Sequence, residues 1–528
     1  MCGIWAILGS QYSPAEHNTG EFMKIAGRGP DLTVITQAAP HLWLGFHRLA
    51  IVEPGDVPSE QPIVADGLSV VCNGEIYNHT QLKHQAPLDN VVNDGSDCAA
   101  ILHAFRLHNG DLRKCCAALD GVFAFVMADA HFCFVLAQKS SALSDCVIVS
   151  TTSTWMLCSN LFGESRERLS IQQYYTLPTT IERNISMLDA QDIIRKLLVD
   201  SVEKRLMGNR LFGFMLSGGL DSSLIASIAS RFLHQTGMQP IAFSVGFEDS
   251  PDLDSAKRVA DYLNIPHRVL VITPQQCIDA IADVVYALET FDPLLVRCGV
   301  AHFLLCKHIA ATSDVKVLLS GEGADELFGS YAYMQCAPSQ ALLHREILRR
   351  LKHLHQYDVL RCDRCTSCHG LEIRVPFLDK KFIEVATRLP PSYKLMENKL
   401  EKHILRSAFT GWLPDEVLWR SKEGFSEALG KIDLEIQRSK LFPWNTPQNK
   451  EEFWYRAIFE RCFELHKVDS LIHTKVYRTA AWHINAEPLS SAKDSTGADG
   501  EMLLSVMEDE ETRFRRRSTG STKFSGVA

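Results

Sequence analysis

The strongest constraint on the fold of this chain lies near its middle, at residues 211–233. An apolar run over residues 211–216 predicts a buried strand, and residues 224–233 predict a helix. The string between them reads SGGLDSS. Its two glycines let backbone N–H groups approach an anion at the N-terminus of the helix. The pattern therefore predicts a phosphate-binding loop in an α/β domain.

The SGGLDSS loop differs from a Walker loop, which ends in Gly-Lys-Ser or Gly-Lys-Thr. It has no such ending, and its residues Ser217, Ser222 and Ser223 add hydroxyl groups to the backbone N–H groups. Asp221 offers a carboxylate, a ligand that magnesium prefers. The loop resembles the pyrophosphate loop of enzymes that split ATP between its α and β phosphates.

A second string supports this interpretation. Val317–Leu319 predicts another buried strand, and SGEGADE follows it at residues 320–326. Parallel α/β sheets bind ligands at the carboxyl ends of their strands, so we expect Glu322 and Asp325 near the first loop. The alternative is a solvated acidic turn, but glycines on both sides of Glu322 favour a functional loop.

The chain begins Met-Cys-Gly-Ile, and its small second residue permits removal of Met1. Cys2 would then carry a thiol and its own α-amine, a base with a pKa of about 7.7 to 8.0. An N-terminal nucleophile of this kind needs no distant histidine. The alternative is a small buried cysteine behind an ordinary initiator.

Residues downstream supply what a glutaminase needs around such a thiol. Arg48 suits bidentate pairing with the carboxylate of an amino acid. Asp97 and Glu75 suit its ammonium group. Asn73 and the N–H of Gly74 can hold the oxyanion of a tetrahedral intermediate. Taken singly, Arg48 or Asp97 also fits an ordinary solvated charge.

Together with the string RGPD at residues 28–31, these residues resemble the glutaminase domain of class II amidotransferases. The whole chain is similar to the glutamine-hydrolysing asparagine synthetases, over roughly residues 2–137 and 190–485. The further matching strings are Ser250–Leu253, Leu288–Thr290 with Asp292 and Arg297, Asp358–Arg361, Gly370–Asp379 and Trp419–Glu423.

The resemblance implies that Cys2 releases ammonia from glutamine and that ATP converts aspartate to an aspartyl-adenylate, with Mg²⁺ present. Glu322 is implied in the adenylate step and is our candidate to take a proton from the attacking ammonia. The residues implied to bind glutamine are Arg48, Leu49, Ala50, Ile51, Val52, Asn73, Gly74, Glu75 and Asp97. Those implied to bind ATP or pyrophosphate are Leu216, Ser217, Gly218, Gly219, Asp221, Ser222, Val245, Ser320, Gly321 and Lys422. Asp221 and Asp325 are the candidate magnesium ligands.

The departures from the family pattern cluster in one stretch. An Arg-Asp-x-x-Gly-x-x-Pro-Leu string is expected after Ala137, where this chain has residues 138–146, and the chain from there to SGGLDSS is short. Since these elements complete the glutaminase sheet and face the synthetase domain, ammonia transfer is the step most affected. Smaller changes are Gly27 for a histidine, Leu294 and Leu295 for a threonine pair, and Glu427 for an aspartate. Loss of the threonine hydroxyls predicts weaker recognition of aspartate.

Composition excludes two classes of function. A formal net charge of −9 argues against binding to a phosphate backbone, so no nucleic-acid partner is expected. The chain shows neither an apolar run judged long enough to span a bilayer nor a signal peptide, which predicts a cytosolic enzyme without membrane contact. The expected partners are glutamine, aspartate and ATP, and the resemblance implies a homodimer.

The predicted fold class is α/β, in two domains. Residues 2–165 are expected to form the glutaminase domain, an αββα sandwich of the N-terminal-nucleophile type. Strands alternate with helices over residues 190–487, which predicts a parallel sheet with helices on both faces, of the pyrophosphate-loop type. Residues 488–528 are expected to be a disordered tail because they are rich in Ser, Gly and charge with few aromatic residues.

The cysteines Cys362, Cys365 and Cys368 form a C-x2-C-x2-C run beside His369, which suggests a metal site as one interpretation. Three positions spaced in this way on a helix converge poorly on one face. We therefore favour reduced, buried thiols, as for most of the 16 cysteines of the chain.

Three functions remain open at this point. The first is glutamine-dependent asparagine synthesis, favoured because both half-sites keep their predicted catalytic residues. The second is a synthetase that uses free ammonia and is uncoupled from its glutaminase, which the altered residues 138–146 motivate. The third is a non-catalytic paralogue that senses ATP or glutamine. Cys2, Asp221, Glu322 and Lys422 speak against the third.

Overall fold

The computed structural model describes residues 2–8, 19–39, 42–52, 59–129, 134–139, 147–151, 156–157, 170–395, 400–420 and 450–463. All of them belong to one compact unit, residues 1–481. The predicted tail over residues 488–528, the candidate Lys422 and residues 140–146 lie outside the described residues. The predicted domain bounds 2–165 and 190–487 stay predictions.

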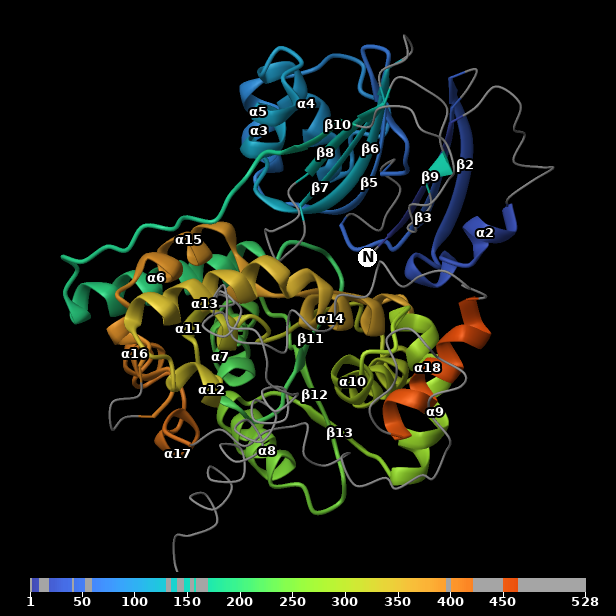
Figure 1. Cartoon of the computed structure of the whole chain (residues 1–528). Coiled ribbons are helices and arrows are strands. Elements are labelled where there is room, and N and C mark those ends of the chain that lie inside the picture. The colour runs from blue at the N-terminus through green and yellow to red at the C-terminus, as the bar shows by residue number, and fades with distance from the viewer. Residues whose placement is uncertain are drawn as a thin grey trace, which may run out of the picture. The chain divides into compact units, whose positions relative to one another are not determined.

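Two antiparallel sheets form the N-terminal part (Figure 1). The four-stranded sheet has the order β2-β3-β1-β9, and the six-stranded sheet has the order β10-β8-β7-β6-β5-β4. Their strands are β1 (Gly3–Leu8), β2 (Leu32–Ala39), β3 (Leu42–Arg48), β4 (Ile63–Ala65), β5 (Leu68–Ile76), β6 (Gly121–Asp129), β7 (Phe134–Lys139), β8 (Val147–Thr151), β9 (Met156–Leu157) and β10 (Ser170–Gln173).

Side-chain alternation explains how these two sheets stack. Leu44 of β3 packs against Val71 and Val126 of β5 and β6, in a cluster shared by the two sheets. Their neighbours Cys72 and Phe125 point to the opposite face and pack with helices α3 (His79–Gln85), α4 (Ala100–Leu107) and α5 (Leu112–Ala118). Helix α2 (Thr19–Met23) lies beside the outer face of the other sheet. The predicted αββα layering is confirmed.

A five-stranded parallel sheet forms the second part, with the order β13-β12-β11-β14-β15. Its strands are β11 (Phe212–Met215), β12 (Ile241–Gly246), β13 (His267–Val271), β14 (Val317–Leu319) and β15 (Glu372–Arg374). The chain runs from β11 outward to β13 and returns to β14 on the other side of β11. The strand order therefore reverses between β11 and β14, and ligands bind at such a reversal, beyond the carboxyl ends of the strands.

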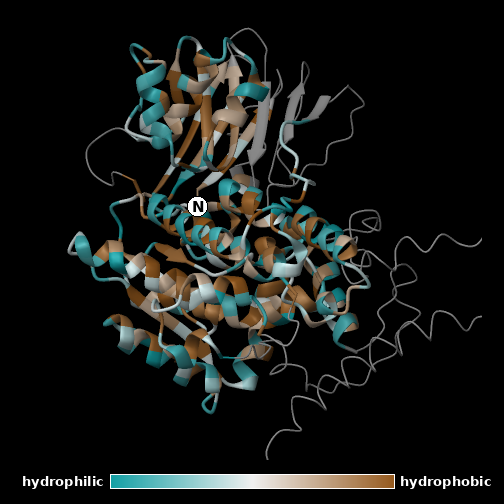
Figure 2. Ribbon diagram, turned by 90° about the vertical axis from the view of Figure 1, so that its left-hand side faces the viewer, coloured by the Kyte–Doolittle hydropathy of each residue, from teal (hydrophilic) through white to brown (hydrophobic). Residues whose placement is uncertain are grey.

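Helices cover both faces of this sheet, as predicted (Figure 1). Phe212 and Phe214 pack in the cluster that contains α7, whereas Phe243 and Leu318 pack with Ile309 of α10. The helices are α6 (Met187–Lys204), α7 (Leu220–Gln235), α8 (Pro251–Leu263), α9 (Pro274–Leu288), α10 (Pro293–Thr312), α11 (Ala324–Phe328), α12 (Ala332–Gln335), α13 (Gln340–His353), α14 (Asp358–Ser367), α15 (Lys380–Arg388), α16 (His403–Ala408), α17 (Asp415–Leu418) and α18 (Lys450–Phe463). Figure 2 shows brown, hydrophobic residues along the strands and teal residues on the flanking helices.

Local signals set the starts of these helices. Asp292 caps α10 by accepting hydrogen bonds from the N–H groups of Leu294 and Leu295, and Pro293 follows as the first helical residue. Thr273 and Gln276 form a capping box at the start of α9. Helix α7 begins at Leu220, four residues before the predicted start, because the second half of SGGLDSS forms its first turn.

Helix α10 bears on the expectation that the chain has no apolar run long enough to span a bilayer. Among the described helices it alone has a length and mean hydropathy, 1.4, that would allow it to cross a membrane. However, 56% of that window is buried inside the protein. Its apolar residues are therefore explained by packing, as in the core helix of an ordinary globular domain.

Candidate functional site

The thiol of Cys2 lies at the start of β1, against the hydrophobic cluster that joins the two antiparallel sheets. The N–H of Leu49 donates to its Sγ at 3.4 Å, and Nε of Arg28 donates to its backbone carbonyl at 3.2 Å. Burial raises the pKa of the Cys2 thiol to about 11. Because so little thiolate exists at neutral pH, the sulfur needs a base beside it, and a free α-amine on the same residue would supply one.

The predicted oxyanion residues lie on β5, in the facing sheet. Gly74 has φ of +148°, and a Cβ there would lie 2.0 Å from the carbonyl oxygen of Val122 on β6. Only glycine fits this close approach. Asn73 precedes it, with its Oδ1 buried and without a hydrogen-bond partner. Because Oδ1 only accepts hydrogen bonds, it suits a donor group of a ligand, whereas the predicted oxyanion contact would come from Nδ2 of the same amide.

Asp97 and Arg48 flank this part of the sheet. The buried Asp97 accepts a hydrogen bond from the N–H of Ile76, at the end of β5, at 2.6 Å. Burial raises its pKa to about 6, so its charged form gains from a cationic ligand. Arg48 ends β3, and its Nη2 donates to Oγ of Ser59. Both residues are thus held in place by other parts of the glutaminase fold.

The predicted residues 49–52 form the loop after β3, and its backbone groups contact the second part of the chain. The N–H of Ala50 donates to the carboxylate of Asp31 at 2.7 Å, and its carbonyl accepts from Nε of Arg210 at 2.8 Å. The carbonyl of Ile51 accepts from the N–H of Asn209 at 3.0 Å, and Val52 packs on the core around β11. These contacts hold the predicted glutamine-binding loop against the region before β11.

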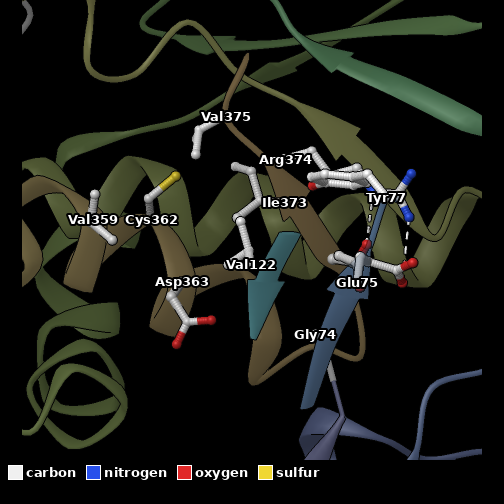
Figure 3. Close-up of a pocket in the computed structure, with 11 residues that line it drawn as sticks. Gly74, Glu75, Tyr77, Val122, Val359, Cys362, Asp363, Ile373, Arg374 and Val375 are labelled. Atoms are coloured by element: carbon white, nitrogen blue, oxygen red, sulfur yellow. Dashed lines mark hydrogen bonds and ion pairs between the residues drawn. The ribbon is translucent and has the colours of Figure 1, made fainter. Parts of the chain in front are cut away.

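Glu75 was predicted to pair with an ammonium group, and the structure shows that it also contacts the parallel sheet. Its carboxylate lies 3.5 Å from Nη2 of Arg374, a residue of β15 in the parallel sheet (Figure 3). Burial and the nearby Glu372 raise the pKa of Glu75. Arg374 is anchored by Glu372 at 2.8 Å and by the carbonyl of Arg205 at 2.6 Å. A residue of the second part thus reaches the glutaminase site.

A pocket lies where these two parts meet (Figure 3). One wall comes from β5, β6 and the residue after β5, and the other from α14, β15 and the residue that follows it. The lining residues are Gly74, Glu75, Tyr77, Val122, Val359, Cys362, Asp363, Glu372, Ile373, Arg374 and Val375. The pocket therefore borders the predicted oxyanion residue on one side and helix α14 on the other.

Helix α14 also contacts Arg28, the residue that holds Cys2. The guanidinium of Arg28 donates to Asp363 at 3.2 and 3.3 Å and to Ser367 at 2.8 Å. Gly27 lies beside the end of the helix, where a Cβ would sit 3.0 Å from the carbonyl oxygen of Cys368. This departure from the family histidine therefore permits a close approach of two backbones.

The phosphate loop has the predicted geometry at the start of α7. Gly218 has φ of +73°, and a Cβ there would meet the backbone nitrogen of Ala256 at 2.5 Å. Ser217 and Ser222 hydrogen-bond to each other, with 3.0 Å between their hydroxyl oxygens. Ser223 is buried, and its hydroxyl has no hydrogen-bond partner among the described residues, so its contact with a ligand stays a prediction.

The second loop touches the first. A Cβ on Gly321 would lie 2.6 Å from the backbone nitrogen of Ser222, so the two loops pack backbone to backbone. The N–H of Ser320 donates to the carbonyl of Arg374 at 3.0 Å. Leu216 accepts a hydrogen bond from Ser244. The predicted ATP residues of β11, β12 and β14, Val245 included, thus lie at the carboxyl ends of neighbouring strands.

Lys402 is a residue that sequence reasoning missed. Its Nζ lies between the two predicted magnesium ligands, 2.5 Å from Asp325 and in contact with Asp221. The side chain is buried, and these carboxylates raise its pKa. Its sequence signal is weak, because it stands between Glu401 and His403 in a stretch that reads as ordinary mixed charge.

Glu322 pairs with Arg361 of α14, whose Nη2 lies 2.7 Å from its Oε1. The same nitrogen lies 3.4 Å from Asp358, three residues earlier on α14, so the pair within the helix is the longer contact. Burial raises the pKa of Glu322, and Arg361 opposes this. The site thus holds a partly buried carboxylate with a raised pKa, which suits a general base.

Cys362 and Cys365 lie on α14, in the predicted helix, and Cys368 follows its last residue, Ser367. Cys365 donates to the carbonyl of Gly299 and Cys368 to that of Cys365, both at 3.6 Å. Within the described residues, no group of three or more His, Cys, Asp or Glu side chains is placed to hold a metal ion.

An N-terminal cysteine site built on stacked antiparallel sheets, followed by a lysine-free phosphate loop on a parallel sheet, defines a class: an amidotransferase domain joined to an ATP-dependent synthetase domain. The profile of the glutamine amidotransferase domain matches residues 1–138, and that of asparagine synthase matches residues 193–341 and 335–492. The chain belongs to the family of glutamine-hydrolysing asparagine synthetases.

Relatives match over most of the chain. An asparagine synthetase of Asparagus officinalis is 37% identical over 521 residues, covering 88% of this chain and 86% of the relative. One of Sandersonia aurantiaca is 36% identical over 536 residues, covering 90% of this chain and 100% of the relative. The resemblance predicted from the motifs is confirmed.

Proposed function

We propose that this protein makes asparagine from aspartate, ATP and glutamine, and releases AMP, pyrophosphate and glutamate. The observation that carries the proposal is the pocket shared by Gly74 and Glu75 on one side and by α14 and β15 on the other. Family membership supports the pair of reactions, and this pocket supports their coupling in one molecule.

In the glutaminase step, the free α-amine of Cys2 takes the thiol proton after Met1 is removed. The thiolate attacks the γ-carbonyl carbon of glutamine, and Asn73 with the N–H of Gly74 stabilises the oxyanion. The α-ammonium returns the proton to the leaving nitrogen, so ammonia departs and a γ-glutamyl thioester remains. Water then hydrolyses the thioester to glutamate. Arg48 and Asp97 hold the two charged ends of the substrate.

In the synthetase step, the β-carboxylate of aspartate attacks the α-phosphorus of ATP and pyrophosphate leaves. The loop of Ser217 and Ser222 binds the departing phosphates at the N-terminus of α7. Lys402 faces the same edge of the sheet and offsets negative charge, as does Lys422 in our prediction. Ammonia then attacks the acyl carbon, AMP leaves, and Glu322 takes the excess proton.

Magnesium fits the residues present. Mg²⁺ is commonly held by one or two carboxylates together with phosphate oxygens and waters, and Asp221 and Asp325 are a pair of this kind. The ion would neutralise phosphate charge in the adenylate step. Lys402 lies between the two carboxylates, so the magnesium ion and the lysine would share them.

Ammonia must reach the adenylate without gaining a proton. The apolar side chains of Val359, Ile373 and Val375 line the pocket next to Gly74. An apolar wall disfavours ammonium relative to ammonia because desolvation penalises the charged form. This wall supports coupling over the second candidate, a synthetase that uses only free ammonia. The expected cytosolic location and homodimer remain predictions.

The test is an assay of asparagine and pyrophosphate with purified, Met1-processed protein, aspartate and Mg-ATP. Equal yields of both products with glutamine, lost in Cys2→Ala and restored by ammonium chloride, are expected. Product with ammonium alone would favour the uncoupled synthetase. Absence of pyrophosphate with either nitrogen donor would contradict the proposal and leave the non-catalytic paralogue.

A further inference from the structure

A buried histidine contacts the arginine that pairs with Glu322. His302 lies in the middle of α10, with only 6% of its surface exposed. Its Nδ1 lies 3.1 Å from Nη1 of Arg361, and its Nε2 lies 3.0 Å from Oγ1 of Thr366. Arg361 and Thr366 both belong to α14. The imidazole therefore links α10 to two positions on the helix that supplies the partner of Glu322.

The partners of His302 determine its tautomer. A guanidinium nitrogen only donates hydrogen bonds, so Nδ1 accepts from Arg361 and carries no hydrogen. The hydrogen lies on Nε2, which donates to Thr366. Burial lowers the pKa of His302 well below its usual value, and the nearby Arg361 and His369 lower it further. The imidazole is therefore neutral, with an acceptor aimed at Arg361.

This acceptor has a specific consequence for the guanidinium of Arg361. Its Nη2 is turned to Glu322 at 2.7 Å and to Asp358 at 3.4 Å. Its Nε is buried without a hydrogen-bond partner. The contact with His302 thus holds Nη1, whereas the carboxylates hold Nη2. Because the guanidinium is planar and rigid, contacts at both Nη1 and Nη2 fix its orientation.

We propose that His302 is a positioning residue for the synthetase site: its Nδ1 fixes the guanidinium of Arg361, which in turn holds the Glu322 carboxylate at the carboxyl end of β14. His302 itself does not touch substrate. This proposal rests on the proposed function of Glu322. It assigns a role in catalysis to a residue of α10 that no sequence motif marks.

Removal of the imidazole leaves Nη1 of Arg361 as a buried donor without a partner. Rotation of the guanidinium toward Asp358 or toward water would satisfy this donor, and the Glu322 carboxylate would move with it. Misplacement of a catalytic group by about 1 Å costs up to about 100-fold in rate. The ATP loops, which do not contact His302 in the described residues, should bind nucleotide as before.

The experiment compares His302→Leu with His302→Asn in the full-length protein. Leucine removes the acceptor, whereas the amide oxygen of asparagine lies near the position of Nδ1. In the ammonium-dependent reaction, His302→Leu should lower kcat about 10- to 100-fold and leave the KM for ATP within about threefold. His302→Asn should recover most of the lost kcat. Glutamine hydrolysis at Cys2, measured without ATP, should be unchanged in both and reports on intact folding.

The control is His344→Leu, because His344 is also buried and contacts a backbone carbonyl, that of Thr179. It should keep the ammonium-dependent kcat. A folded His302→Leu with unchanged kcat, or a His302→Asn as impaired as His302→Leu, would overturn the proposal.

A second measurement does not depend on the synthetase activity. Nitrogen-15 NMR of selectively labelled histidine, assigned by loss of the signal in His302→Asn, should show a neutral ring with its hydrogen on Nε2 between pH 6 and 8. A hydrogen on Nδ1 would contradict the role of His302 even if asparagine is made. A wild-type protein that makes no asparagine but shows the expected tautomer would contradict the proposed function alone.

Discussion

At the scale of single residues, the two sites show how environment assigns different properties to the same side chain. Asp379 is buried beside Arg205 and Lys204, and these cations hold its pKa well below the usual range despite burial. Asp97 is equally buried but accepts its short hydrogen bond from a backbone N–H, and burial raises its pKa to about 6. Asp97 therefore changes charge near working pH, whereas Asp379 does not.

A pH dependence of glutamine binding follows from Asp97. The carboxylate is needed to pair with the ammonium of glutamine, so the KM for glutamine should fall as pH rises through about 6. The raised pKa has the opposite effect on folding: the folded state binds the proton more tightly than the unfolded state, so stability is lost as pH rises from the unfolded value to about 6.

Steady-state kinetics from pH 5 to 8 would test this dependence. The ammonium-dependent reaction should lack the change in KM, and Asp97→Asn should bind glutamine weakly at every pH. A KM for glutamine that stays constant through pH 6 would contradict the role of Asp97.

The glycine after Asn73 gives a second prediction at this scale. Gly74→Ala places a Cβ 2.0 Å from the carbonyl oxygen of Val122, so β5 must move away from β6. Glutamine-dependent activity should fall more than 100-fold, as expected when an oxyanion donor is displaced. Gly67→Ala is the matched control, since φ is also positive there, at +79°, but no atom lies within 4 Å of the added Cβ. Equal losses in the two variants would show that backbone strain alone is responsible.

At the scale of elements, sequence periodicity predicted the strands and loops whose signals are local. The strand β11, the phosphate loop and the strand β14 are continuous in sequence and carry strong apolar and glycine patterns, so their positions were predicted. The burial of Ser223 was not predicted, because hydroxyl chemistry does not reveal which side of a first helical turn faces the core. Lys402 and His302 were missed because their partners lie 77 or more and 59 or more residues away, and only the folded chain brings them together.

The start of α10 allows a prediction about an element. Asp292 accepts hydrogen bonds from Leu294 and Leu295 at 3.0 and 3.2 Å, so Asp292→Ala leaves two N–H groups without their cap. We expect a loss of about 1 kcal/mol in the free energy of unfolding, and Asp292→Asn should lose less. Urea denaturation measures this. If the alanine variant unfolds at the same urea concentration as the parent, water or another group caps the helix.

At the scale of the whole molecule, contacts between distant parts of the sequence bear on coupling. Arg374 contacts Glu75 of the glutaminase site through its guanidinium, and its carbonyl accepts from Ser320 of the ATP loop. Helix α14 pairs Arg361 with Glu322 at one position and Asp363 with Arg28 at another. Sequence reading found the two sites but not these links, because each link joins residues far apart in the sequence that only the folded chain brings together.

These links predict that coupling can be broken without loss of either reaction. Asp363→Asn keeps the size of the side chain but removes the charge that pairs with Arg28, which in turn holds the carbonyl of Cys2. The two half-reactions use other residues, and loss of one partly exposed pair costs only about 1 kcal/mol. The rates of glutamine hydrolysis and of ammonium-dependent synthesis should therefore each stay within about threefold of the parent. The ratio of glutamate to asparagine formed from glutamine should rise above one, because ammonia escapes where the parts no longer meet closely.

Asp66→Asn, which breaks an exposed pair with Arg106, is the control and should leave the ratio unchanged. A ratio that stays at one in Asp363→Asn would mean that the path of ammonia does not depend on this contact, and that Arg374 and Glu75 suffice to hold the pocket closed.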